Sequence, residues 1–142
     1  MPGRRTVWGM RWKVALSSAV LLLVAGCSET NVTAHDSDNG RHVTIEKGDV
    51  FDIVLADNYP TSHCQWHEEG TPDTAILNYL GSRYQWDTTA PAAPGTFTSR
   101  YKATGAGAVH VTLVQEDNAH HVARRFALDV TVLKRLIDLG AA

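Results

Sequence analysis

The chain has 142 residues, of which 44% are hydrophobic and 20% are charged, and its formal net charge is −2. Beyond the first 26 residues, nine Lys and Arg stand against fifteen Asp and Glu, so this part of the chain carries −6 with neutral histidines. Nucleic-acid-binding proteins need a basic face, and this balance argues against that class of partner. The length allows one domain with one hydrophobic core.

The first 26 residues are typical of an export signal. Four Arg and Lys residues form a cationic head, and an apolar run over residues 14–26 ends in small residues. A run this short cannot cross a bilayer, so the layout is that of a secretory signal rather than a spanning helix. The run ends in Leu23-Val24-Ala25-Gly26-Cys27, which resembles the bacterial lipobox. The resemblance implies that residues 1–26 are removed and that Cys27 receives a diacylglyceryl thioether and fatty acyl chains such as palmitate.

A lipid on Cys27 would tether the protein to the extracytoplasmic side of a bacterial cell membrane, because two or three acyl chains hold firmly. The alternative is a cysteine that happens to follow a general secretory signal. Residues 27–40 are predicted to be the lipidated cysteine and a flexible spacer, since residues 28–40 are polar and show no apolar period. With Cys27 modified, Cys64 is the only thiol left, so we expect no intramolecular disulfide.

Residues 41–133 alternate apolar and polar side chains in short runs, which is typical of strands with one buried face. Residues 75–86 also fit a helical stripe, but the internal Gly81 and the neighbouring strands favour a strand. The predicted strands cover residues 42–46, 51–56, a short stretch from Trp66, 75–86, 97–103, 109–114 and 126–132, and residues 134–142 form a C-terminal tail. We therefore predict an all-β, immunoglobulin-like sandwich of about seven antiparallel strands, with a barrel as the alternative.

A polar stretch links two predicted strands and ends by burying a tryptophan: Asn58-Tyr59-Pro60-Thr61-Ser62-His63-Cys64-Gln65-Trp66. A turn of Asn and Pro followed by hydroxyl side chains is typical of a stiff recognition loop, although the same residues fill ordinary connections. Two further segments are Val43-Thr44-Ile45-Glu46-Lys47-Gly48-Asp49-Val50-Phe51 and Gly95-Thr96-Phe97-Thr98-Ser99-Arg100-Tyr101-Lys102-Ala103-Thr104. In these three segments the chain resembles the chagasin family, the immunoglobulin-like inhibitors of papain-type cysteine proteases, and the resemblance covers residues 43–132.

In that family, three loops at one end of the sandwich form a wedge that fills the protease cleft, with no covalent step. The first loop carries Asn-Pro-Thr-Thr-Gly and an aromatic residue, closely followed by Trp. The matching residues here are Asn58, Pro60, Thr61 and Ser62. The resemblance implies that these four residues contact a papain-type protease, with Thr61 and Ser62 against its catalytic Cys and His.

The chain departs from the family pattern at each loop. In the first loop Tyr59 is inserted, and His63 and Cys64 stand where the family has Gly and an aromatic residue. A glycine accepts a positive φ that a residue with a Cβ, such as His63, tolerates poorly. The second loop, rich in glycine in the family, reads Pro91-Ala92-Ala93-Pro94-Gly95, and the third, residues 115–125, lacks Arg-Pro-Trp. These departures keep open a second function, a non-inhibitory envelope protein that binds a protein partner or handles a metal weakly.

Metal, catalytic and sugar-binding sites are less strongly indicated by the sequence than the protease-contact loop. Imidazole and thiolate are zinc and copper ligands, and the candidates on loops at one end of the sandwich are His63, Cys64, His120 and His121. Unrelated surface histidines are more common, so we expect no metal and no cofactor. Nothing in the sequence near Cys64 suggests an oriented base or an oxyanion site, so we expect no catalytic residue and no enzyme activity. An aromatic strip for sugar binding is a further alternative, although core positions are more typical of Trp66, Tyr79, Tyr84, Trp86 and Tyr101.

Overall fold

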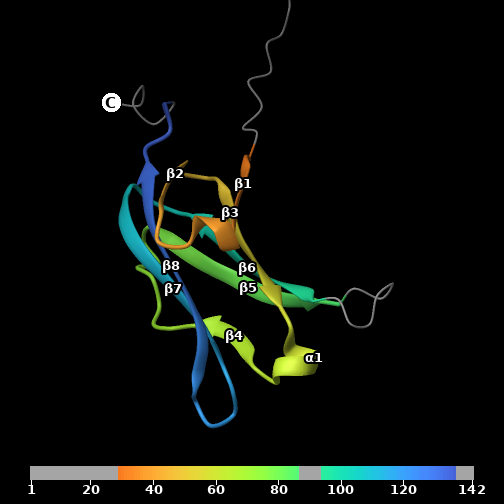
Figure 1. The fold of residues 1–142 in the computed structure, drawn as a ribbon. Helices are drawn as coiled ribbons and strands as arrows, with labels where there is room; N and C mark the ends of the chain where they lie inside the picture. Colours follow the sequence, from red (N-terminus) through yellow and green to blue (C-terminus); the bar gives the residue numbers. More distant parts are fainter. Residues whose placement is uncertain (1–28, 87–93, 137–142) are drawn as a thin grey trace, which may run out of the picture.

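Eight strands form two four-stranded sheets in residues 29–86 and 94–136, the part of the chain that the computed structural model describes. One sheet has the order β1-β3-β6-β5 and the other the order β2-β8-β7-β4 (Figure 1). The strands are β1 (Asn31–His35), β2 (His42–Glu46), β3 (Val50–Asp57), β4 (Gln65–Glu68), β5 (Leu77–Gln85), β6 (Gly95–Ala103), β7 (Gly107–Glu116) and β8 (Val122–Leu133). Two short helices are η1 (Asp36–Asp38) and α1 (Tyr59–Ser62). The predicted immunoglobulin-like sandwich is confirmed.

The core lies between the two sheets, where every second residue of a strand points inward. Phe51, Ile53 and Leu55 of β3 are fully buried, and Leu128 and Val130 of β8 belong to the same apolar cluster. This period of two is the pattern from which the strands were predicted, because side chains of a strand alternate between its faces. Removal of these apolar surfaces from water is the main force that holds the sheets together.

The strand predicted over residues 75–86 is confirmed, with the observed bounds Leu77–Gln85. β5 pairs antiparallel with β6, from Leu77 opposite Ala103 to Gln85 opposite Thr96. The register shifts between Tyr79 and Gly81, and Gly81 has a φ of 142°. A bulge with a positive φ is a position where glycine is favoured over other residues, which explains why a glycine interrupts this strand.

A hydrogen bond joins the sheets beside the core. Tyr101 of β6 is fully buried, and its hydroxyl donates to Oε1 of Glu68, the last residue of β4, at 2.6 Å. Burial and the nearby Glu68 carboxylate raise the pKa of Tyr101, so the phenol stays protonated as a donor. Glu68 is therefore a structural hydrogen-bond acceptor that links the two sheets.

The prediction of a flexible spacer over residues 28–40 is wrong for residues 31–38. Residues 31–35 form β1, which pairs parallel with β3 from Asn31 opposite Val50 to His35 opposite Val54. Ala34 is 1% exposed and belongs to the core. The domain thus begins about ten residues earlier than predicted, and the cause is the pairing with β3, which supplies hydrogen bonds that the local sequence does not reveal.

The sheets are mixed, and not wholly antiparallel as predicted. β1 pairs parallel with β3, and β2 pairs parallel with β8, while all other pairs are antiparallel. β8 also begins at Val122, four residues before the predicted start, because its first residues continue the antiparallel ladder with β7. The strand count rises from the predicted seven to eight through β1.

Several predicted features lie outside the described residues: the signal over residues 1–26, the lipid site Cys27, most of the Pro- and Ala-rich second loop, and the last six residues of the tail. Within residues 29–86 and 94–136, the structure contains no helix that is both long and apolar enough to cross a bilayer.

The burial of β1 predicts an effect of Ala34→Asp on stability. We expect a loss of about 3 kcal/mol in the free energy of unfolding, because an unpaired carboxylate would be buried in the core. The same substitution at Thr44, an exposed residue of the edge strand β2, serves as the control and should cost less than about 1 kcal/mol. Urea denaturation followed by circular dichroism measures both. Equal effects of the two variants would mean that residues 31–35 are not part of the folded domain.

Candidate functional site

The candidate contact residues lie at one end of the sandwich. β3 ends at Asp57 and leads into α1, and the chain then returns into β4. The turn between β7 and β8 lies at the same end, whereas β1 begins at the opposite end (Figure 1). Strand directions require this arrangement, since β1 and β3 run parallel and β3 runs toward α1.

The loop expected after β3 is a single helical turn. The backbone carbonyl of Asn58 accepts hydrogen bonds from the backbone N–H groups of Thr61 and Ser62, each at 2.9 Å, and from the Thr61 hydroxyl at 3.0 Å. Pro60 stands in the first turn, where its missing N–H costs no hydrogen bond and its fixed φ suits a helix. The backbone of α1 is therefore internally bonded and presents its side chains from a defined conformation.

A buried polar bridge holds α1 against both sheets. The Asp57 carboxylate accepts the backbone N–H of Tyr59 at 3.0 Å, which fixes the first residue of α1. Gln115 of β7 is 1% exposed, and its Nε2 donates to Oδ1 of Asn58 at 3.2 Å and to Oδ1 of Asp57 at 3.4 Å. Burial raises the pKa of Asp57, and the hydrogen bonds from Tyr59 and Gln115 oppose this shift. One amide from the second sheet thus fixes the base of the loop.

Three of the four predicted contact residues are exposed: Asn58, Pro60 and Thr61. Ser62 is half-buried, and its Oγ accepts the backbone N–H of Cys64 at 3.1 Å. The structure therefore brings the four residues together at one helical turn, with Asn58, Pro60 and Thr61 exposed and Ser62 half-buried. Such a projection can fill a cavity of a partner, but it holds no group that is set up for chemistry.

The tryptophan after the loop is buried, as expected. Trp66 is 5% exposed, and its Nε1 donates to the backbone carbonyl of Ala56 in the opposite sheet at 3.1 Å. The guanidinium of Arg124 lies over the indole ring, 5.2 Å from the ring centre. Trp66 thus links the two sheets next to α1 through its buried ring and its hydrogen bond, and Arg124 adds a cation–π attraction.

His63 occupies the position where the family has glycine, and its backbone is left-handed. Its φ is 55° and its ψ is 23°, and its backbone N–H donates to the carbonyl of Tyr59 at 2.9 Å. This is the usual end of a helix, for which glycine is preferred because a Cβ is strained there. The sequence argument about a positive φ at His63 is confirmed.

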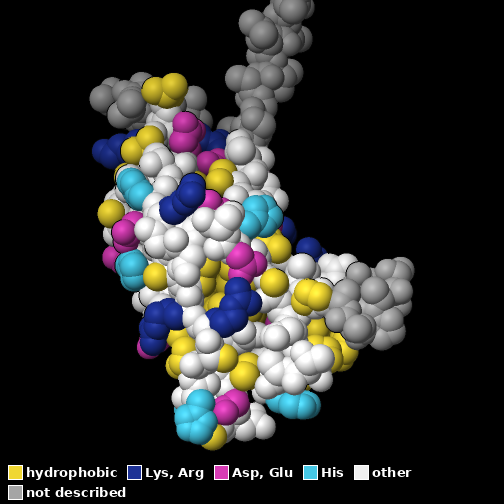
Figure 2. Space-filling view, in the orientation of Figure 1, with side chains coloured by type: hydrophobic (Ala, Val, Ile, Leu, Met, Phe, Trp, Pro, Cys, Tyr) yellow, Lys and Arg dark blue, Asp and Glu magenta, His cyan; other side chains and the backbone are white. Residues whose placement is uncertain are grey.

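The candidate metal ligands do not converge. Cys64 is 8% exposed and donates from Sγ to the carbonyl of Ser62 at 3.4 Å. His120 and His121 lie on the β7–β8 turn, where His120 pairs with Glu116 and His121 with Asp117. Figure 2 shows histidines at this end, over the turn and beside α1. Among the described residues there is no group of three or more His, Cys, Asp and Glu placed to hold a metal ion.

The sequence analysis missed a cluster of hydrogen-bonded charged side chains beside the β7–β8 turn. Oε1 of Glu116 accepts Nε2 of His67 at 2.7 Å and Nδ1 of His120 at 3.1 Å. These two hydrogen bonds lower the pKa of Glu116, with His120 the larger cause. The spacing of four between Glu116 and His120 was a signal in the sequence, whereas the approach of His67 depends on the pairing of β4 with β7.

The fold is similar to two solved structures. One is the cysteine protease inhibitor EhICP2 from Entamoeba histolytica, with a TM-score of 0.63 and 14% sequence identity over 76% of this chain and 100% of that chain. The other is amebosin, with a TM-score of 0.59 and 23% identity over 72% of this chain and 98% of that chain. These likenesses confirm the chagasin-like sandwich that the sequence resemblance implied. No protein-family model matches the chain, and no curated protein matches it.

The left-handed backbone of His63 predicts that His63→Gly stabilises the protein. We expect a gain of about 0.5–1 kcal/mol in the free energy of unfolding, because glycine removes the Cβ strain at a positive φ. The control is Gln65→Gly, two residues further in β4, which should lose about 0.5–1 kcal/mol because its backbone is extended. Denaturation curves of both variants provide the comparison. A loss of stability in both would contradict the assigned conformation of residue 63.

Proposed function

We propose that this protein inhibits a papain-type cysteine protease by inserting α1 into the active-site cleft. The observation that supports this best is the exposed Pro60-Thr61 projection on a helical turn fixed by Asp57 and Gln115. This helical turn projects from a domain whose fold is similar to that of a cysteine protease inhibitor. The comparison is with an inhibitor and not with an enzyme, in agreement with the expectation that this chain has no catalytic role.

Inhibition would work by occlusion. The loop makes its own hydrogen bonds through Asn58, Thr61 and Ser62, so little conformational entropy is lost when a partner binds. Thr61 is exposed at the outer surface of α1 and would face the catalytic Cys and His. Cys64 is buried and bonded within the loop, so a mixed disulfide is not part of the proposed mechanism.

Affinity should be modest for a wedge of this kind. The β7–β8 turn carries exposed His120 and His121 where the family resemblance calls for a tryptophan. A buried aromatic anchor typically contributes on the order of 2 kcal/mol or more to an interface. The same observation favours the second candidate, an envelope module of this fold that binds another protein partner without inhibiting a protease.

We also propose that Cys27 carries a lipid and that the domain lies on the extracytoplasmic side of a bacterial membrane. Asn31 begins β1 only four residues after Cys27. Since β1 begins at the end opposite α1, an anchor there would direct the proposed contact loop away from the membrane (Figure 1). This orientation is compatible with capture of a protease outside the cell membrane.

The proposed inhibition is tested with papain and a soluble form of the chain from Ser28 onward. We expect inhibition in the micromolar range or tighter, and its loss in Thr61→Arg, which places a bulky charge on the contact surface. Thr44→Arg on β2, also exposed but remote from α1, is the matched control and should inhibit like the wild type. Absence of inhibition by a folded wild-type domain would leave the non-inhibitory module as the better function.

The lipid anchor is tested in bacteria that express the full chain. Radiolabelled palmitate should enter the wild-type protein and direct it to the membrane fraction, because multiple acyl chains give stable anchoring. Cys27→Ser should abolish both label and membrane association, whereas Cys64→Ser, which changes the other cysteine, should retain both. Label that persists in Cys27→Ser would refute lipidation at this residue.

A further inference from the structure

A cleft of about 280 Å³ opens beside α1, between the end of β5 and the start of β4. Its walls are largely aromatic, and the residues that matter here are Asp57, Tyr59, Trp66, Tyr84, Trp86 and Phe97. Trp86, the residue after the end of β5, is 57% exposed.

Asp57 supplies a negative charge to this cleft. Its Oδ1 accepts the hydrogen bonds from Tyr59 and Gln115, while Oδ2 accepts none from the described residues. Arg124 approaches from β8, but its guanidinium is bonded to Asp36 at 2.6 Å and to the carbonyl of Ala56 at 3.2 Å. The carboxylate is thus only partly neutralised, although the residue is 3% exposed.

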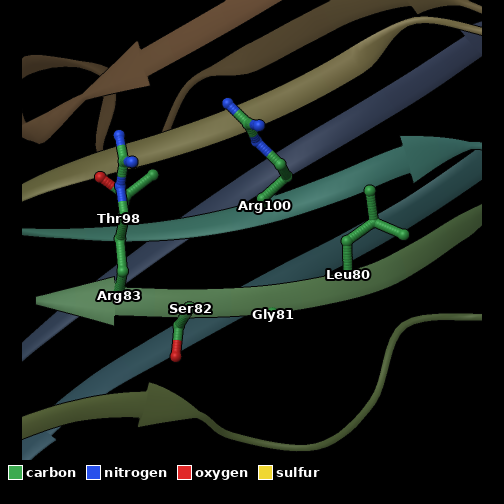
Figure 3. Close-up of a pocket in the computed structure, with 6 residues that line it drawn as sticks. All are labelled: Leu80, Gly81, Ser82, Arg83, Thr98 and Arg100. Carbon is green, nitrogen blue, oxygen red and sulfur yellow. The ribbon is translucent and has the colours of Figure 1, made fainter.

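Arg83 also lines the cleft, but its side chain extends toward β3 on the outer face of the sheet. Figure 3 shows it on the same side as Arg100, whereas Ser82 points to the opposite side. Arg100 itself is held by two hydrogen bonds of 2.8 Å to the carboxylate of Asp52. Asp57 therefore supplies the negative charge among the residues that line the cleft, whereas the guanidinium of Arg83 lies on the other side of the sheet.

Tyr84 adds an unsatisfied polar atom. Its hydroxyl is buried and has no hydrogen-bond partner in the described part of the chain. Burial and the Asp57 carboxylate both raise the pKa of Tyr84, which places the phenol within the field of this charge. The ring contacts Trp86 edge to face, with 5.3 Å between centres. A Cβ at Gly95 would lie 2.8 Å from the hydroxyl, so glycine at this position preserves the site.

We propose that this cleft binds a primary alkylammonium group, with its methylene chain against Trp86 and its charge facing Asp57. The negative faces of aromatic rings attract a cation, and the carboxylate adds a full opposite charge. A primary ammonium carries three donors, of which one matches the free Oδ2 of Asp57 and the others can remain hydrogen-bonded to water in the open cleft. An anion would be repelled by Asp57, and a neutral alcohol would leave its charge uncompensated. This assignment does not depend on protease inhibition.

The test is calorimetric titration of the full chain in detergent with n-butylammonium chloride. We expect saturable binding in the millimolar range, and at least about tenfold weaker binding of the neutral comparator 1-butanol. Asp57→Asn keeps the Oδ1 acceptor for Tyr59 and should weaken butylammonium binding by about tenfold or more. Trp86→Leu should weaken it severalfold, while Tyr79→Leu, an exposed aromatic of β5 that does not line the cleft, should not change it.

Two further ligands show whether the site takes a lysine side chain or a free amine, and whether the N–H donors of the ligand matter. N-acetyl-lysine amide that binds more tightly than butylammonium would assign the site to a lysine side chain of a bound protein, and weaker binding would assign it to a free amine. Tetramethylammonium, which has no N–H donors, should bind more weakly than butylammonium. Equal affinities for butylammonium and butanol, unchanged by Asp57→Asn, would overturn the proposal, as would the absence of saturable binding. If Asp57→Asn does not fold, the affinity of Trp86→Leu for butylammonium tests the proposal, because a substitution at this exposed residue should leave the fold intact.

Discussion

The buried amide of Gln115 ties the two sheets together at the end where α1 projects. A buried polar side chain is tolerated only when its hydrogen bonds are made, and Nε2 of Gln115 finds acceptors on both Asp57 and Asn58. Loss of this amide would leave the Asp57 carboxylate buried with one donor fewer. The position of the contact loop is therefore coupled to the pairing of β7 with its neighbours, and not only to the residues of the loop itself.

Asp57 has two roles at this end of the molecule. Its Oδ1 accepts the backbone N–H of Tyr59, the first residue of α1, and Asp57 also lines the aromatic cleft beside the loop. Tyr59, whose N–H it accepts, also lines that cleft. A ligand in the cleft and a partner on α1 would thus share one carboxylate and one aromatic ring, so occupation of either site should alter the affinity of the other.

Strands with a clear alternation of apolar and polar residues were predictable from the sequence. β1, which forms because it pairs with a distant strand, was not. β3 was predictable because its apolar residues recur at every second position: Phe51, Ile53 and Leu55, all of them buried. β1 offers only Val32 and Ala34 to the core, and its parallel partner is separated from it by η1 and β2, so composition indicated a spacer instead. At the site, the positive φ of His63 followed from the family pattern. The role of Gln115 was within reach, since Val111, Leu113 and Gln115 alternate onto one buried face.

The parallel pairing of β1 with β3 has a mechanical consequence. With Cys27 held in a membrane and α1 held by a partner, tension would pull β1 from its first residue and β3 from its last. These two points lie at opposite ends of a parallel pair, so the load runs along the strands and reaches all five registered residue pairs together. Strands pulled in this shearing direction resist separation better than strands peeled apart one bond after another. A domain tethered through β1 would therefore withstand pulling forces between its anchor and its binding surface.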